Sequence, residues 1–257
     1  MSYAQYRRLR TLFPGASLKP TTDIVEDVAL VKDREEIASL RAAVAISDRV
    51  FEQVLKNIRP GVTEREVSAE ISYWHKSYGA ENDAFEPIVA SGKRGALPHA
   101  RATTKKIASR ELVTLDFGCV VNGYHSDITR TIGIGSVGRK GRDVYSVVLD
   151  AQTAAIASAH SGMRVDDLDA TARNVIRKRG YGRYFTHSLG HGIGLSIHER
   201  PRISRLGKEY LHEGSVVTIE PGIYIPGYGG VRIEDDILLT SRGCEVLNAA
   251  SKEFIAL

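Results

Sequence analysis

The chain has 257 residues with 35 basic and 31 acidic side chains, which gives a formal net charge of +4. The first twenty positions hold no acid and four of the basic residues, Arg7, Arg8, Arg10 and Lys19. The rest of the chain has 31 basic and 31 acidic residues, and this balance argues against a nucleic-acid-binding body. No segment holds the ~18 consecutive apolar residues that a membrane span needs, and two widely separated cysteines cannot form a disulfide framework, so we expect a reduced, cytoplasmic protein with no membrane partner.

The first segment, residues 1–27, contains Pro14, Gly15 and Pro20, and we expect it to be irregular. Such a segment is typical of a tail, or of the remnant of an N-terminal domain and its linker. Residues 28–257 show the apolar periodicity of a folded protein, and their length is sufficient for one large domain.

Two capping boxes predict the first two helices of that domain. In Asp33-Arg34-Glu35-Glu36, the aspartate and the glutamate three residues later can satisfy the free amides of a helix start. Apolar residues then recur at helical spacing until Pro60-Gly61. Thr63-Glu64-Arg65-Glu66 repeats the box, and Gly79 is expected to end the second helix.

The second half of the chain repeats this plan. A helix is expected over 142–159, and the stretch from Gly162 to Gly180 is as long as the stretch that begins at Gly61 and ends at Gly79. VTLDFG at 113–118 then corresponds to VTIEPG at 217–222, each a short apolar strand with a carboxylate followed by glycine two residues later. We therefore predict an internal duplication, helix–helix–strand–strand twice, and an α+β fold with pseudo-twofold symmetry.

Two aspartates are predicted to share one face of a hairpin. Asn122-Gly123 lies between two β-rich runs and favours a two-residue turn. That turn would pair Asp116 with Thr129 and place Asp127 on the same face, ~7–8 Å away on the diagonal. No lysine or arginine alternates on this face of the two strands, so a metal ion is the expected compensation. For Asp116 alone, a salt bridge is the alternative.

The repeat predicts that Glu220 and Glu234 occupy the positions of Asp116 and Asp127, which would bring four carboxylates to one axis and call for two divalent ions. His187, His191 and His198 lie in THSLGHGIGLSIHERP, where the glycines argue against a helix and indicate a close approach of backbone segments. One histidine among several carboxylates favours manganese, cobalt, iron or zinc.

Four segments together resemble the pita-bread metallopeptidases, a superfamily of Xaa-Pro aminopeptidases, Xaa-Pro dipeptidases (prolidases), methionine aminopeptidases and creatinase. The segments are DFGCVVNGYHSDITRTIGIG, HSLGHGIGLSIHERP, TIEPGIY and GGVRIEDD. The resemblance covers about 28–257 and implies that this part is a duplicated catalytic domain with two divalent ions, manganese first, with cobalt, zinc or iron as alternatives. It implies five metal ligands: Asp116, Asp127, His191, Glu220 and Glu234.

The resemblance also implies a mechanism in which two ions activate a bridging hydroxide. Glu220 is the candidate general base, His198 would stabilise the oxyanion, and His99 would hold the substrate or relay a proton. The residues expected to contact the substrate are His187, Arg232 and Tyr224.

The expected activity is hydrolysis of the N-terminal Xaa-Pro bond of peptides, of the Xaa-Pro aminopeptidase type. An Xaa-Pro dipeptidase is the alternative, and a methionine aminopeptidase comes next, although its pattern has Glu-His-Thr where this chain has Ile233-Glu234-Asp235. Creatinase lacks the ligands found here. A non-catalytic peptide- or protein-binding module is the hypothesis from another class, and a homodimer is possible.

Overall fold

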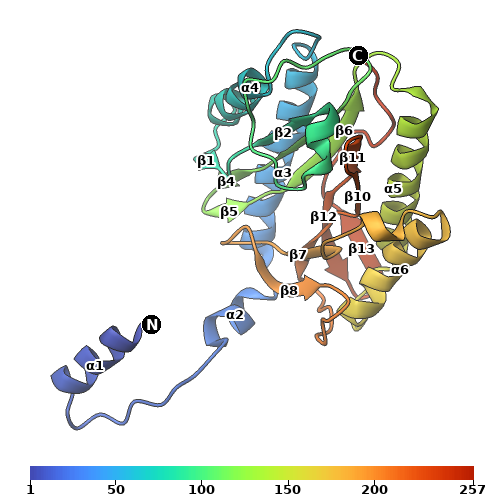
Figure 1. Cartoon of the computed structure of the whole chain (residues 1–257). Helices are drawn as coiled ribbons and strands as arrows, with labels where there is room; N and C mark the ends of the chain where they lie inside the picture. The colour runs from blue at the N-terminus through green and yellow to red at the C-terminus, as the bar shows by residue number, and fades with distance from the viewer.

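The computed structural model describes all residues, 1–257. Strands lie in the middle of the body, with α3 and α4 on one side and α5 and α6 on the other (Figure 1). The helices are α1 (Tyr3–Leu12), α2 (Ile24–Ala29), α3 (Arg34–Leu55), α4 (Glu64–Ser77), α5 (Gly138–Ser158) and α6 (Val165–Lys178), with short 3-10 turns η1 (Gly92–Ala96) and η2 (Gly182–Tyr184). None of the helices combines the length and apolar character required to cross a membrane.

The strands form two main sheets, one for each half of the chain. The first has the order β2-β3-β6 and the second β13-β12-β9-β7-β8, while β10-β11 and β1-β4-β5 form smaller sheets. The first-half strands are β1 (Asn82–Asp83), β2 (Ile88–Ser91), β3 (Leu112–Phe117), β4 (Cys119–Val121), β5 (Tyr124–His125) and β6 (Ile128–Gly133). The second-half strands are β7 (Gly190–Gly192), β8 (Glu199–Ile203), β9 (Val216–Ile219), β10 (Gly222–Ile225), β11 (Gly229–Arg232), β12 (Asp235–Thr240) and β13 (Gly243–Val246).

The predicted duplication is visible in the pairing. β3 pairs antiparallel with β6 in the first half, and β9 pairs antiparallel with β12 in the second. Each half carries its own packed helix pair, α3 with α4 and α5 with α6. The two halves meet where Thr129 forms an isolated antiparallel bridge with Glu234, and we call this contact region the seam. The predicted α+β architecture is thus confirmed.

The capping boxes place the helix starts as predicted. The Asp33 side chain accepts hydrogen bonds from the amides of Glu35 and Glu36, and the Glu36 carboxylate accepts one from the Asp33 amide. Thr63 and Glu66 do the same for α4. α5 begins at Gly138, one turn before the start expected from its apolar pattern, because the first turn is polar and gives no hydrophobic signal.

Each half buries a separate apolar core. A cluster of 25 buried residues lies between α5, α6 and the second-half strands, and a cluster of 15 lies between α3, α4 and the β2-β3-β6 sheet. Removing apolar surface from water contributes roughly 25 cal/mol per Å² to the free energy of folding, so cores of this size hold the two sheets firmly in place. The seam between the cores is therefore a stable platform for polar side chains.

The expectation that residues 1–27 are irregular is wrong at both ends of the segment, where α1 and α2 form, and is confirmed only for 13–23. Ser2 and Gln5 form a capping box that starts α1, and α2 follows near the body. Neither helix contains a buried residue, and α1 projects away from the body (Figure 1). Asp27 of α2 forms an ion pair with Arg200 at 2.7 Å, and Lys32 is the first residue of the chain that is buried, with a side chain that is 1% exposed. The assignment of this segment as a tail or domain remnant stays a prediction.

Candidate metal and peptide site

The hairpin from β3 to β6 has the predicted register. Val121 pairs with Tyr124 across the turn, and Asp116 pairs with Thr129. Asn122 and Gly123 have φ angles of 51° and 80°, as the two-residue turn requires. This register places both aspartates of the hairpin at the seam between the halves.

The two glutamates reach the same place from the second half. Glu220 follows the end of β9 and Glu234 immediately precedes β12. The Glu234 amide donates to the Thr129 carbonyl at 3.1 Å, and the Thr129 hydroxyl donates to the Glu234 carboxylate at 2.6 Å. The strands of both repeats therefore deliver their carboxylates to one point, as the internal symmetry predicts.

His191 lies on β7, in the glycine-rich stretch expected to be a close backbone approach. A Cβ at Gly190 would lie 1.9 Å from the Thr218 carbonyl oxygen, and one at Gly192 would lie 2.1 Å from the Arg200 carbonyl oxygen. Only glycine fits between these strands. The arrangement sets Nε2 of His191 at 3.8 Å from an Asp127 oxygen and 3.5 Å from a Glu220 oxygen.

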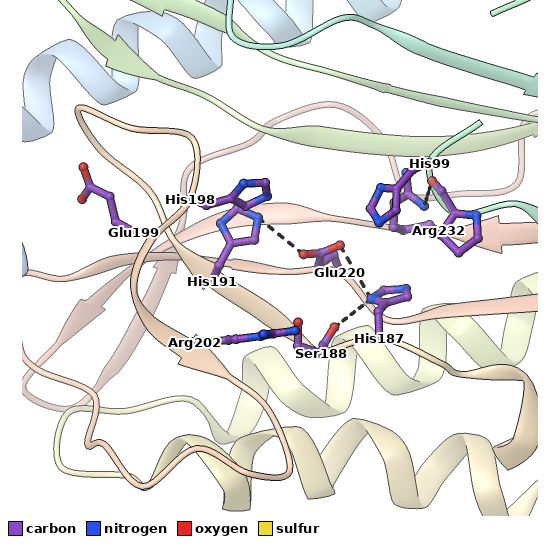
Figure 2. Close-up of a pocket in the computed structure, with 10 residues that line it drawn as sticks. His99, His187, Ser188, His191, His198, Glu199, Arg202, Glu220 and Arg232 are labelled. Carbon is purple, nitrogen blue, oxygen red and sulfur yellow. Dashed lines mark hydrogen bonds and ion pairs between the residues drawn. The ribbon is translucent and has the colours of Figure 1, made fainter. Parts of the chain in front are cut away.

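One cavity of about 230 Å³ is lined by all five predicted metal ligands. Ligand atoms of Asp127, His191 and Glu234 lie within 4.8 Å of one another, which is a spacing a single ion can span. Asp116, which forms an ion pair with Arg232, and Glu220 lie outside this tight group. Figure 2 shows the neighbouring cavity of about 380 Å³, in which His191 and His198 stand beside Glu220.

The donor set fits divalent ions. One buried oxygen on each of Asp116, Asp127 and Glu234 has no hydrogen-bond partner. Burial and neighbouring carboxylates raise the pKa of Asp127 well above its usual range and that of Glu234 to about 8, so like charges oppose one another there. Burial lowers the pKa of His191 to about 4, and its Nδ1 is bonded to the Gly192 carbonyl, which leaves Nε2 as a neutral ligand.

Arg232 changes the charge balance expected from the sequence. Its guanidinium forms an ion pair with Asp116 and donates to the Tyr224 hydroxyl at 2.6 Å and to the Pro98 carbonyl at 3.2 Å. The aspartate is thus compensated in part by an arginine, contrary to the expectation that metal alone balances the site. The charge comes from β11, which is neither strand of the hairpin, so inspection of those two strands could not find it.

The predicted substrate residues surround this arrangement. His99, His187, His198 and Arg232 line the cavity of about 380 Å³, which Glu220 also borders. Tyr224 is buried behind them and its hydroxyl lies 3.0 Å from Nε2 of His187. The structure therefore brings all ten predicted site residues to one region, nine of them at the walls of the two cavities and Tyr224 one layer behind.

Sequence reasoning missed three participants. Thr129 joins Glu234 to Arg232 through its hydroxyl, and the alternation in DITRT could have indicated that it shares a face with Asp127. Arg202 lines the larger cavity and forms no ion pair. Lys32 reaches Glu199, the residue after His198, at 3.0 Å across 167 positions, and no local pattern signals that contact.

Known proteins share this fold and sequence along the whole chain. An Xaa-Pro dipeptidase of Pyrococcus furiosus is 45% identical over 255 residues, which are 99% of this chain and 73% of that protein. The structure of an Xaa-Pro dipeptidase from Bacillus anthracis matches with TM-score 0.98 and 46% identity over 100% of this chain and 72% of that one. An X-Pro aminopeptidase from Thermotoga maritima matches with TM-score 0.96 and 40% identity over 100% and 73% of the two chains.

The sequence pattern of Metallopeptidase family M24 matches residues 38–241. That span contains the four carboxylates and the histidine gathered at the seam, and the fold around them is the one in the dipeptidase structures. The resemblance to pita-bread metallopeptidases of the Xaa-Pro branch is thus confirmed, and so is the α+β pita-bread fold. The chain belongs to metallopeptidase family M24 and is a metallo-exopeptidase of its Xaa-Pro peptidase branch.

Proposed function

We propose that the protein is a divalent-metal-dependent Xaa-Pro dipeptidase. The similar proteins named above include Xaa-Pro dipeptidases at 45% and 46% identity, which favours the dipeptidase alternative over the aminopeptidase expected from the sequence alone. The single observation that carries the choice is Arg202, an arginine without an ion-pair partner in the wall of the catalytic cavity. A dipeptide has its carboxylate within a few ångströms of the scissile bond, and arginine binds carboxylates in bidentate geometry.

The residues proposed to hold the ions are the two aspartates, the two glutamates and His191, with manganese as the first expectation and cobalt, zinc or iron as alternatives. Bound there, the ions would supply Lewis-acid polarisation of the scissile carbonyl and acidify water. The chain's own contribution to this site is rigidity: β-sheet ladders and the Thr129 hydroxyl hold the ligands in place.

Proton transfer is assigned to Glu220. Its two oxygens lie 3.5 Å from His191 Nε2 and 4.0 Å from His187 Nδ1, at the border of both cavities. In the proposed step the oxygen of water bonds to the carbonyl carbon, the C–N bond breaks, and Glu220 carries one proton from water to the proline nitrogen. The carboxylate is positioned by the end of β9 and by the Glu220 amide, which donates to the Leu189 carbonyl at 2.8 Å.

The histidines are assigned to the substrate. The His198 ring stands edge-on to His191, with centroids 4.4 Å apart, and it faces the cavity where the carbonyl oxygen gains charge. His99 lies across the same cavity and is proposed to hold the substrate or relay a proton. His187, Tyr224 and Arg232 form a connected wall that is proposed to receive the proline ring.

An Xaa-Pro aminopeptidase acting on longer peptides is the second candidate, since an X-Pro aminopeptidase shares the fold at TM-score 0.96. A cytoplasmic location and a homodimer remain predictions; both cysteines are free, which accords with a reducing compartment.

The test is a metal analysis followed by turnover of three substrates, Ala-Pro, Ala-Pro-Ala and Met-Ala-Ala, with added manganese or cobalt. We expect hydrolysis of Ala-Pro, its loss with a chelator, and its loss in Glu220→Gln. Asp150→Asn, at an exposed carboxylate on α5, is the matched control and should keep full activity. Cleavage of Met-Ala-Ala alone would overturn the Xaa-Pro assignment, and Glu220→Gln with more than about a tenth of normal activity would overturn the proton-transfer role.

A further inference from the structure

Three cavities lie next to one another in a row that begins at the catalytic site. The catalytic cavity of about 380 Å³ shares His187, Ser188 and Arg202 with a second cavity of the same volume. That second cavity in turn shares Arg173 and Arg205 with a third, of about 710 Å³, which runs along α6 and η2. The row of cavities extends well beyond the cavity that a dipeptide would occupy.

Three of the four arginines that line the third cavity have no acidic partner. Arg177, Arg183 and Arg205 are exposed and form no ion pair; Arg183 only donates to the neighbouring Tyr184 hydroxyl, at 2.6 Å. We call these three residues, with Asn174 beside them on α6, the arginine groove.

The acids near the arginine groove are already engaged. Asp169 accepts two hydrogen bonds from Arg173, at 2.7 and 2.8 Å. Glu209 is held by Arg200 at 2.7 Å. The positive charge of the groove is therefore unbalanced, although the chain after residue 20 is neutral as a whole.

Guanidinium groups without an ion-pair partner in a concave surface select carboxylates. Arginine is weakly hydrated and its planar fork matches a carboxylate in bidentate geometry, so it binds acidic side chains with direction as well as charge. A peptide with its scissile bond at Glu220 would reach this groove if its chain continued past Ser188 and Arg202, which line both of the first two cavities.

We propose that the arginine groove binds acidic residues that follow the proline of longer peptides, so that the enzyme also hydrolyses Xaa-Pro-Glu-Glu-type substrates and prefers them to neutral or basic ones. This inference rests on the proposed Xaa-Pro activity and names a substrate class for the same site. It adds peptides beyond the dipeptide, chosen by charge.

The test compares kcat/KM for Ala-Pro-Glu-Glu, Ala-Pro-Ala-Ala and Ala-Pro-Lys-Lys at low and high salt. We expect the acidic peptide to exceed the basic one about tenfold at low salt, which is the size that two exposed ion pairs give. Salt should reduce the ratio because such pairs are screened. The double variant Arg177→Gln/Arg205→Gln should abolish the preference and leave Ala-Pro turnover unchanged.

The matched control is Arg7→Gln/Arg10→Gln, which changes the net charge equally but lies on the projecting α1. Equal kcat/KM values for the three peptides would overturn the proposed role of the arginine groove. The same holds for a preference that the Arg177→Gln/Arg205→Gln variant keeps. The proposal would also be overturned if Ala-Pro-Glu-Glu were neither cleaved nor able to compete with Ala-Pro. Normal Ala-Pro turnover in those cases shows that the proposed dipeptidase activity stands. If no peptide is hydrolysed, calorimetric binding of the three peptides to both variants tests the groove without catalysis.

Discussion

The ion pair between Lys32 and Glu199 gives the sharpest stability prediction. Its ammonium and carboxylate lie 3.0 Å apart, with side chains 1% and 14% exposed. Lys32→Met removes the charge and keeps the side-chain length, so it leaves Glu199 without its cation inside the fold. Removing one partner of a buried pair costs ~3–5 kcal/mol. We expect about 3 kcal/mol, because Glu199 keeps a hydrogen bond from the Ser196 amide and retains some contact with solvent.

The assay is urea and thermal unfolding against a matched surface pair. Arg41 and Glu245 are joined by two hydrogen bonds of 2.6 and 2.7 Å, but their side chains are 44% and 47% exposed, and such pairs contribute ~0–1 kcal/mol. Arg41→Met should therefore shift the midpoint by only a few degrees, whereas Lys32→Met should lower it by roughly 6–12 °C. Equal shifts in the two variants would refute the argument from burial. In the double variant Lys32→Met/Glu199→Gln, part of the loss should be recovered, because no unpaired charge remains.

Three further predictions concern the metal ligands, a close backbone contact and a buried carboxylate. Metal binding should tighten as pH rises toward 8 and should release protons, because burial raises the pKa of Glu234 to about 8 in the metal-free chain. Calorimetry in buffers of different ionisation enthalpy measures the number of protons released, and binding without proton release would contradict the prediction. Gly190→Ala should destabilise the fold by more than ~4 kcal/mol, since the new Cβ would lie 1.9 Å from the Thr218 carbonyl oxygen, whereas Gly15→Ala, which meets nothing within 4 Å, should leave unfolding unchanged. Burial opposes ionisation of Glu64, but hydrogen bonds from backbone and hydroxyl donors prevail and lower its pKa. The ionised carboxylate therefore contributes its full share to the free energy of unfolding above pH 4.5, and this share is lost as the pH falls. In Glu64→Gln the free energy of unfolding should fall less steeply as the pH is lowered, and an unchanged slope would rule this out.

Local chemistry made much of the site predictable. The Asn122-Gly123 turn fixes the hairpin register through backbone conformation alone, and this register places Asp116 opposite Thr129. The repeat then extends the argument to Glu220 and Glu234 without any knowledge of their surroundings. These steps need only spacing and turn type, both of which a sequence records.

Long-range and weakly packed features were not predictable. The ion pair of Arg232 with Asp116 joins positions 116 residues apart, and no alternation in β11 indicates which sheet it will face. α1 was missed for the opposite reason: its capping box is present at Ser2, but no buried face supports it, and the prolines and glycine that follow suggested irregular chain. Where stability depends on tertiary contact, spacing alone does not decide the outcome.

The bridge between Thr129 and Glu234 also bears on how the site forms during folding. Asp116 and Asp127 belong to the first half of the chain, while His191, Glu220 and Glu234 belong to the second. Neither half can assemble the donor set alone. The proposed donor set therefore comes together only when the two sheets dock, so that assembly of the site and assembly of the fold are the same event.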